Sequence, residues 1–218
     1  MSPSPMNTDD LIEALAGRLE PVSTRAAWGW MALWIGAGVA VSAVAMFMRL
    51  GLRPDIAAAV STSMFWTKFL YTLALGGLAL WLTERLGRPG AKVGQPVRML
   101  QSVALGFIVL ATVRYFSAVA PARHALLMGH SAHLCPWYIL ALSIPVLAGA
   151  IIGMRRLAPT RPTLAGLSAG LAAGGVAAFV YAFSCDESAI PFVALWYTLP
   201  VLGSGLIGAL VGRFALRW

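Results

Sequence analysis

Six long apolar runs occupy most of this 218-residue sequence and restrict its fold more than any other feature. A helix needs about 20 mainly apolar residues to cross the hydrocarbon core of a bilayer. Lipid offers no partners to backbone hydrogen-bonding groups, so runs of this length are expected to span as helices. The sequence therefore predicts an all-α integral membrane protein with six transmembrane helices. The predicted spans are residues 28–48, 64–82, 99–119, 134–154, 164–183 and 191–210.

The composition supports a lipid environment and argues against a soluble fold. Only 11% of the residues are charged, 59% are hydrophobic, and the mean hydropathy is +0.79, whereas soluble domains carry about 25% charged residues. The connectors between the runs are too short to fold on their own. The net charge of +8 raises the question of nucleic acid, but the basic residues form no patch with interleaved aromatics. We therefore expect the bilayer as a partner and no direct nucleic-acid binding.

The distribution of lysine and arginine predicts the orientation, because cytoplasmic loops of membrane proteins carry an excess of these residues. One set of connectors and both termini hold eleven of them, and the opposite set holds three. Both termini are therefore expected in the cytoplasm, with residues 1–25 as a cytoplasmic tail and 26–218 as the six-helix bundle. The larger set is Arg18, Arg25, Arg85, Arg88, Lys92, Arg98, Arg155, Arg156, Arg161, Arg213 and Arg217, and the smaller is Arg49, Arg53 and Arg123.

Two basic residues, Lys68 and Arg114, fall inside predicted spans, and no Asp or Glu lies deep in any of them. Ionisable groups in a span are costly and raise a functional hypothesis. Each lies about one turn from the outer end, so we expect its side chain to snorkel to the interface or to make a structural contact. A small transporter or channel would need a polar cavity, and few residues are available to line one. They are Gln101, Ser102, Thr112 and Ser143.

Small residues predict how the last two spans pack. Gly166, Gly170 and Gly174 recur at steps of four in the fifth span, and Gly208 and Gly212 share that step in the sixth. Small residues on one face let membrane helices approach closely. The pattern predicts contact between these two helices within one chain, with a homo-oligomer face as the alternative. Pro145 and Pro200 are each expected to kink or loosen a turn of their spans.

The two cysteines fall at span ends that face outward in the predicted topology. Cys135 begins the fourth span, and Cys185 follows the fifth. Three interpretations remain open: a structural disulfide, a redox-responsive dithiol, or a metal site with His130 and His133 as further ligands. A heavy-metal ion at the cysteines is the only cofactor to consider, because thiolate and imidazole suit zinc, cadmium or copper. No Cys-x-x-Cys motif of a membrane disulfide-exchange enzyme is present.

The N-terminal segment predicts a short acidic helix with one apolar face. Thr8 can cap it, and Asp9 and Asp10 suit the positive end of the helix dipole. Leu11, Ile12 and Leu15 share a stripe, and Gly17 followed by Pro21 ends the helix. Anionic lipid repels an acidic helix, so the groove of a protein partner is the better destination. A frayed tail, or one docked on its own bundle, is the alternative.

Several segments together resemble one bacterial family, the six-helix membrane anti-sigma factors named for the negative regulator of sigma F. The resemblance covers essentially the whole chain. Its most specific parts are Thr-Asp-Asp-Leu-Ile at residues 8–12 and Ser-Cys-Asp-Glu-Ser-Ala-Ile-Pro-Phe at residues 184–192. Leu-Trp-Tyr at 195–197 and the ending Gly212-Arg213 with Arg217-Trp218 also match.

The resemblance implies a mechanism and a place in the cell. Such proteins hold an extracytoplasmic-function sigma factor at the bacterial inner membrane through their short cytoplasmic N-terminus. Stress by heavy metal or oxidation, sensed through paired cysteines, releases it. The resemblance then makes Cys135 and Cys185 the sensor pair and implies no enzymatic activity. It gives no role to the histidines, and its sigma-factor contacts would be Asp9, Asp10, Leu11, Ile12 and Leu15.

Two other functions compete with this one. A small transporter or channel would conduct a solute through the bundle. A membrane thiol oxidoreductase would turn over Cys135 and Cys185 with an electron partner.

Overall fold

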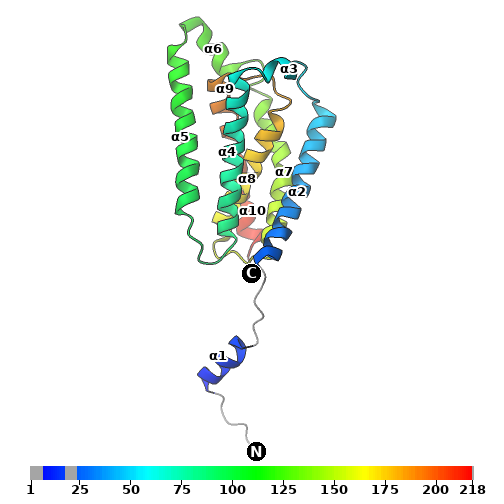
Figure 1. The fold of residues 1–218 in the computed structure, drawn as a ribbon, viewed down its shortest axis with the longest axis vertical. Coiled ribbons are helices and arrows are strands. Elements are labelled where there is room, and N and C mark those ends of the chain that lie inside the picture. The colour runs from blue at the N-terminus through cyan, green and yellow to red at the C-terminus, as the bar shows by residue number, and fades with distance from the viewer. Residues whose placement is uncertain (1–6, 18–23, 218) are drawn as a thin grey trace, which may run out of the picture.

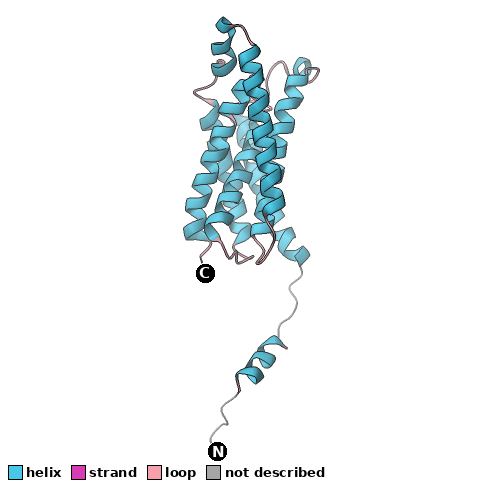
Figure 2. Ribbon diagram, turned by 90° about the vertical axis from the view of Figure 1, so that its left-hand side faces the viewer, coloured by secondary structure: helices cyan, strands magenta, loops and turns pink. Residues whose placement is uncertain are grey.

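The chain is a bundle of helices standing side by side, with one short helix apart from them (Figure 1). The computed structural model describes residues 7–17 and 24–217, and every regular element within these ranges is helical (Figure 2). The helices are α1 (Thr8–Ala16), α2 (Thr24–Arg49), α3 (Ile56–Ala59), α4 (Ser63–Leu86), α5 (Gly94–Ser117), α6 (Ala120–Met128), α7 (Cys135–Met154), α8 (Pro162–Tyr181), α9 (Ile190–Trp196) and α10 (Thr198–Ala215).

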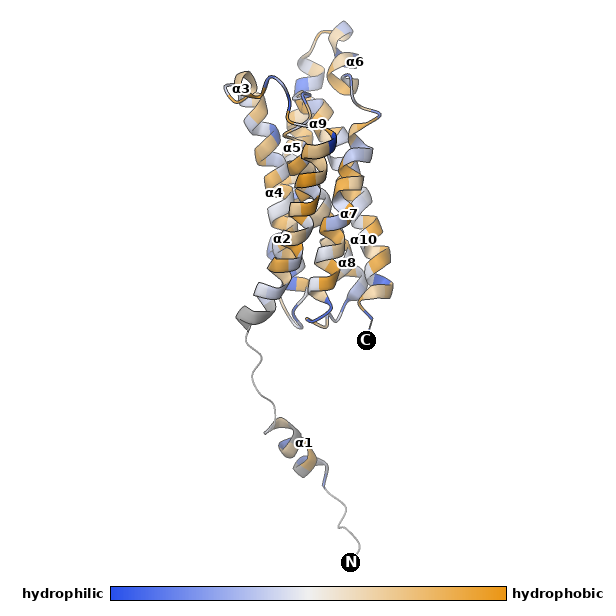
Figure 3. Cartoon of the chain, turned by 90° about the vertical axis from the view of Figure 1, so that its right-hand side faces the viewer, coloured by the Kyte–Doolittle hydropathy of each residue, from blue (hydrophilic) through white to orange (hydrophobic). Residues whose placement is uncertain are grey.

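Six helices of the described part are long and apolar enough to cross a membrane, which confirms the all-α, six-span prediction. They are α2, α4, α5, α7, α8 and the pair α9–α10. Figure 3 shows their apolar residues along the bundle and hydrophilic residues gathered toward its ends. The second predicted span ended too early, at Leu82. Helix α4 continues to Leu86 and so includes Glu84, which is buried and accepts a hydrogen bond of 3.1 Å from Trp28 Nε1.

The sixth span is interrupted, as Pro200 predicts. Helix α9 ends at Trp196 and α10 begins at Thr198. Proline has no backbone N–H, so Pro200 cannot donate to the carbonyl of Trp196 four residues earlier. The break falls at Tyr197, directly after Trp196, whose carbonyl lacks that hydrogen bond. Pro145 lies inside α7 without ending it.

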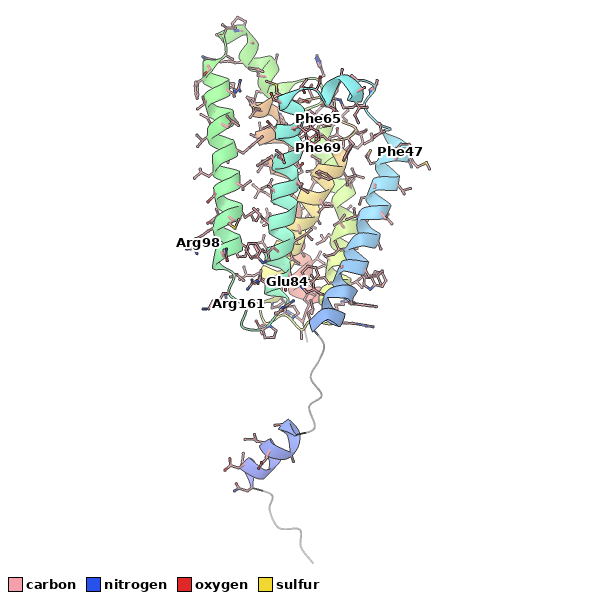
Figure 4. All side chains as sticks on the ribbon, in the orientation of Figure 1. Phe47, Phe65, Phe69, Glu84, Arg98 and Arg161 are labelled. Carbon is pink, nitrogen blue, oxygen red and sulfur yellow. The ribbon has the colours of Figure 1, made fainter. Side chains whose placement is uncertain are left out.

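The connectors divide between the two ends of the bundle in the predicted alternation. The α4–α5 and α7–α8 connectors and the C-terminus lie at one end, while α3, α6 and the start of α9 lie at the other (Figure 1). Figure 4 places Glu84, Arg98 and Arg161 at the first end and Phe65 and Phe69 toward the second. The basic connectors therefore share one end, here called the basic end. The other is called the cysteine end, because Cys135 and Cys185 lie there.

Helix α8 is the centre of the bundle, and its small residues make that position possible. In its most apolar stretch 67% of residues are buried, compared with 17% in α5. A Cβ atom at Gly170 would lie 2.8 Å from the Cα of Gly205 on α10, and one at Gly175 would lie 2.7 Å from the Cα of Gly76 on α4. The predicted contact between the fifth and sixth spans within one chain is confirmed.

Helix α2 packs against α7 along most of its length. A Cβ at Gly38 would lie 2.8 Å from the Cα of Val146, and the Ser42 hydroxyl donates a buried hydrogen bond of 2.7 Å to the carbonyl of Leu142. Since α7 begins at Cys135 and α2 continues toward the N-terminal segment, this pair of helices connects the two ends of the molecule.

Candidate functional site: a buried thiol pair

The two cysteines are in contact at the cysteine end of the bundle. Cys135 is the first residue of α7, and Cys185 follows α8 in the loop before α9. Both are free, their exposed fractions are 0% and 4%, and their sulfur atoms are 3.8 Å apart. A disulfide bond is about 2.05 Å long. The structure therefore places the two sulfur atoms in van der Waals contact without a bond between them, one at the start of α7 and the other in the loop after α8.

Hydroxyl groups surround the sulfur of Cys135. The Ser131 Oγ lies 3.1 Å from it and the Tyr181 Oη 3.2 Å from it. Ser131 precedes Cys135 by four residues, and Tyr181 precedes Cys185 by four. A third hydroxyl, on fully buried Tyr197, has no well-formed hydrogen bond to any described residue. The thiols thus sit in a buried polar pocket within an apolar bundle.

Lys68 reaches this pocket from α4, and the snorkelling predicted for it is wrong. Its side chain is 1% exposed, and its Nζ donates hydrogen bonds of 2.8 Å to the carbonyl of Cys185 and 2.9 Å to that of Glu187. These two carbonyls lie in the connector after α8, so the ammonium turns inward to hold that loop. The predicted alternative, a structural contact, describes Lys68. Arg114, by contrast, is exposed on α5.

Arg53 fixes the same loop from the connector after α2. Its backbone N–H donates to the carbonyl of Phe183, and its guanidinium donates to the Cys185 carbonyl over 3.3 Å. The hydrogen bond with Asp55, 2.7 Å long, raises the pKa of Arg53 and lowers the pKa of Asp55. Both side chains are therefore charged, and the loop of Cys185 is tied to the connector at the cysteine end of α2.

Electrostatics favour the thiolate form of Cys185. The hydrogen bond from the Cys135 thiol is the largest influence that lowers the pKa of Cys185 to about 6, against burial, which raises it. The positive charge of Lys68 and the nearby hydroxyl of Tyr197 lower that pKa further. A thiolate is the reactive form of cysteine. The lowered pKa therefore makes Cys185 the thiol of the pair that ionises more readily, and protonation at lower pH removes the thiolate.

The predicted four-residue metal site does not come together. Within residues 7–17 and 24–217, no group of three or more His, Cys, Asp or Glu side chains could hold a metal ion. His130 and His133 are exposed while both cysteines are buried, and His130 approaches the site only through its backbone N–H, which donates to Glu187. A heavy-metal ion on the two thiols alone stays a prediction.

The residues named for a transport pathway are also dispersed. Gln101, Ser102 and Thr112 are exposed on α5, and Ser143 is engaged in a buried hydrogen bond from Ser204. A cavity of about 540 Å³ is lined mainly by apolar side chains between α5, α6 and α9. Thr112 borders this cavity, and Gln101 borders a different one between α4, α5, α8 and α10.

The predicted partner-binding residues lie on α1. The helix runs from Thr8 to Ala16, and Asn7 takes the N-cap position predicted for Thr8 because its backbone is the extended one. Leu11 and Ile12 are 43% and 59% exposed, and Asp9 is exposed as well. The side chains of Asp10 and Leu15 fall outside the described residues. Leu11 and Ile12 of the apolar stripe are therefore open to a partner.

Sequence reasoning missed most of the pocket around the thiols. Lys68 was noted only as a charge in a span, and nothing in the sequence pairs it with Cys185. Ser131 and Tyr181 carried a usable signal, because a residue four positions before a helical or helix-flanking cysteine lies one turn away. Tyr197 and Arg53 are brought in by tertiary packing alone.

Comparison with known proteins finds sequence relatives along nearly the whole chain. The sequence profile of the family described as "Negative regulator of sigma F" matches residues 15–218. The chain is 39% identical over 213 residues to the probable anti-sigma-F factor NrsF of Azospira oryzae, covering 98% of this chain and all of that protein. It is 41% identical over 220 residues to the anti-sigma-F factor NrsF of Caulobacter vibrioides, with the same coverage. No solved structure matches.

Proposed function

The chain belongs to the negative regulator of sigma F family, and from this premise we propose that it is a membrane-anchored anti-sigma factor. It holds an extracytoplasmic-function sigma factor through α1 and releases it when Cys135 and Cys185 change state. The match to two anti-sigma-F factors over 98% of the chain carries the proposal. It assigns a regulatory and not an enzymatic role.

The basic end supports the placement of α1 with the sigma factor. Loops rich in arginine and lysine stay in the cytoplasm, where a sigma factor and RNA polymerase are found. We propose the bacterial inner membrane as the location, with both termini inside and the thiol pair on the periplasmic side. The exposed face of α5 leaves room for a second copy of the chain in a homo-oligomer.

Helix α2 supplies a physical connection between the sensor and the tail. At the cysteine end, the Ser184 hydroxyl donates to the carbonyl of Gly51 and the Arg53 N–H donates to that of Phe183. At the basic end, Trp28 contacts Glu84 of α4. A change at Cys185 therefore acts on both the loop after α2 and, through Cys135, on the helix against which α2 packs. Signalling then requires only that the bundle has two arrangements and that the state of the cysteines favours one of them.

Affinity capture from membranes tests the binding step. The full-length protein should retain a sigma factor of the same cell, and a version lacking residues 1–20 should not. Ile12→Ser should weaken capture because it removes an exposed apolar contact on α1, whereas Glu13→Ser, on the opposite side of the same helix, should leave it unchanged. Equal capture by the truncated and full-length proteins would overturn the proposal.

Cysteine variants test the sensing step separately. Cys135→Ser and Cys185→Ser should each still bind the sigma factor but lose release by oxidant or heavy metal, as read from a sigma-dependent reporter. Unchanged induction in both variants would remove the thiol pair from the mechanism.

A further inference from the structure

Lys68 is a buried cation for which the described residues offer no carboxylate partner. The described ion pairs join Arg53 to Asp55 and Arg85 and Arg88 to Glu84, and none includes Lys68. Its hydrogen bonds go to two neutral carbonyls, and its Nζ lies 5.8 Å from the centre of the Tyr197 ring. An ammonium removed from water without a compensating anion is costly. A negative charge in the surroundings would offset this cost.

The carboxylates near Lys68 are engaged elsewhere or face solvent. Asp55 pairs with Arg53, the Glu187 carboxylate accepts the His130 N–H, and Asp186 is exposed. The other charged group in the pocket, Arg53, is itself a cation.

The remaining titratable groups that pack around Lys68 are two thiols and two phenols. They come from α7, α8, the loop after α8, and the junction of α9 and α10: Cys135, Tyr181, Cys185 and Tyr197. A cysteine thiol loses its proton at a far lower pH than a tyrosine phenol. The compensating charge is therefore a thiolate.

The two thiols are not equivalent toward Lys68. The ammonium binds the backbone carbonyl of Cys185 itself, so it is held beside that residue, while Cys135 belongs to α7 and contacts the hydroxyls of Ser131 and Tyr181. The thiol of Cys135 is also placed to donate its proton to Cys185, 3.8 Å away. Geometry thus assigns the negative charge to Cys185 and the proton to Cys135.

We propose that Lys68 is a positioning residue that makes Cys185 the reacting thiolate of the pair and leaves Cys135 as the resolving thiol, toward an oxidant of the hydroperoxide class. The assignment rests on the proposed function, in which this pair is the sensor. It deepens that function by naming the order of reaction and the residue that imposes it.

The reaction balances in two steps. The Cys185 thiolate attacks the hydrogen-bearing oxygen of the hydroperoxide, an S–O bond forms, and the O–O bond breaks. The departing hydroxide or alkoxide takes up a proton from water, and Cys185 becomes a sulfenic acid. The sulfur of Cys135 then attacks the sulfur of Cys185, an S–S bond forms, and the S–O bond breaks. The thiol proton leaves with the hydroxyl as water. Cys185 then carries no charge, so Lys68 loses its anion and its hold on the loop weakens.

Sulfenic-acid trapping on the purified full-length protein tests the assignment. Hydrogen peroxide and dimedone are added to Cys135→Ser and to Cys185→Ser, and the adduct is quantified by mass spectrometry. Cys135→Ser should accumulate the adduct at Cys185, and Cys185→Ser should react about tenfold or more slowly at pH 7, because its remaining thiol lacks the adjacent ammonium. Equal rates for the two thiols would overturn the assignment.

Lysine variants in the Cys135→Ser background test the role of Lys68. Lys68→Met should slow trapping about tenfold or more at pH 7 and move the pH profile of the rate to higher pH, because Cys185 then ionises less readily. Lys68→Arg, which keeps the charge, should restore most of the rate. Lys92→Met is the matched control, since Lys92 is exposed in the α4–α5 connector, and it should change nothing. An unmoved pH profile in Lys68→Met would refute the role.

Two further measurements are needed. One distinguishes the role of Lys68 from an effect on folding, and the other distinguishes the order of reaction from the proposed function. Helical circular dichroism and an SDS unfolding midpoint that match those of the Cys135→Ser parent show that the Lys68→Met variant folds; if that variant does not fold, the comparison of the two single cysteine variants and Lys68→Arg still decides. Peroxide-driven release of the sigma factor without preference for Cys185 would refute the assignment while keeping the function. Preferential oxidation of Cys185 without release would support the assignment and refute the function.

Discussion

The glycine contact between α8 and α10 gives the sharpest test of the bundle. A Cβ at Gly170 would meet the backbone of α10, with the Gly205 Cα 2.8 Å away and the Ser204 carbonyl oxygen closer still. Backbone atoms cannot rotate away as a side-chain end can, so Gly170→Ala must push the two helices apart. Overpacking of this kind costs about 1–3 kcal/mol.

Gly77→Ala is a matched control, because it makes the same chemical change at a position with nothing within 4 Å. Alanine favours a helix over glycine by about 0.5–1 kcal/mol, and this gain is common to both variants. The difference between them is therefore the packing cost, about 1–3 kcal/mol.

Unfolding in mixed micelles with increasing SDS, followed by helical circular dichroism, measures that difference. Gly170→Ala should unfold at a lower SDS fraction than Gly77→Ala, which should match or exceed the unmodified protein. If the two variants unfold at the same SDS fraction, α8 and α10 do not pack through this face and the reasoning fails.

Three other predictions concern the thiol pair, the contact between α2 and α7, and the topology. Mild oxidation should join Cys135 to Cys185 within one chain, detected by mass spectrometry of the linked peptides, because the sulfurs are already 3.8 Å apart; links between chains instead would contradict the pairing. Ser42→Ala should lower the free energy of unfolding by about 0.6–1.5 kcal/mol, since it removes the buried hydrogen bond to the Leu142 carbonyl, and the SDS titration measures it. A green fluorescent protein fused at the C-terminus should fluoresce and alkaline phosphatase fused there should be inactive, because the basic end is expected in the cytoplasm; the reverse would invert the topology.

The spans were predictable because the bilayer imposes a length and an apolar character that are local properties of sequence. The ends of the helices were less predictable than the spans themselves. Glu84 is polar, yet it lies in α4, because its carboxylate accepts a hydrogen bond from Trp28 on α2 and pairs with Arg88 one turn later. The α8–α10 contact was also predictable, since Gly170 and its neighbours at steps of four have few other uses in a membrane helix.

The pocket around the thiols was predictable only in part. Topology placed Cys135 and Cys185 at one end of the bundle, but the distance between them depends on how α7 and α8 pack, which no local pattern encodes. For the same reason the sequence left open whether Lys68 would snorkel or make the structural contact that it does make. The rule that lysine near a span end extends to the interface fails when a loop from another part of the chain offers two carbonyls closer than water does.

Burial of the thiols also separates a sensor from a thiol oxidoreductase. Exchange between proteins proceeds through a mixed disulfide, in which one sulfur must approach the other directly. Cys135 is 0% exposed and Cys185 4% exposed, so a partner protein has no approach to either sulfur in this conformation. A hydroperoxide or a metal ion is small enough to enter where a protein disulfide is not. The same packing that places Lys68 and Cys135 beside Cys185 thus favours reaction with small molecules over exchange with another protein, as the proposed sensing of chemical stress requires.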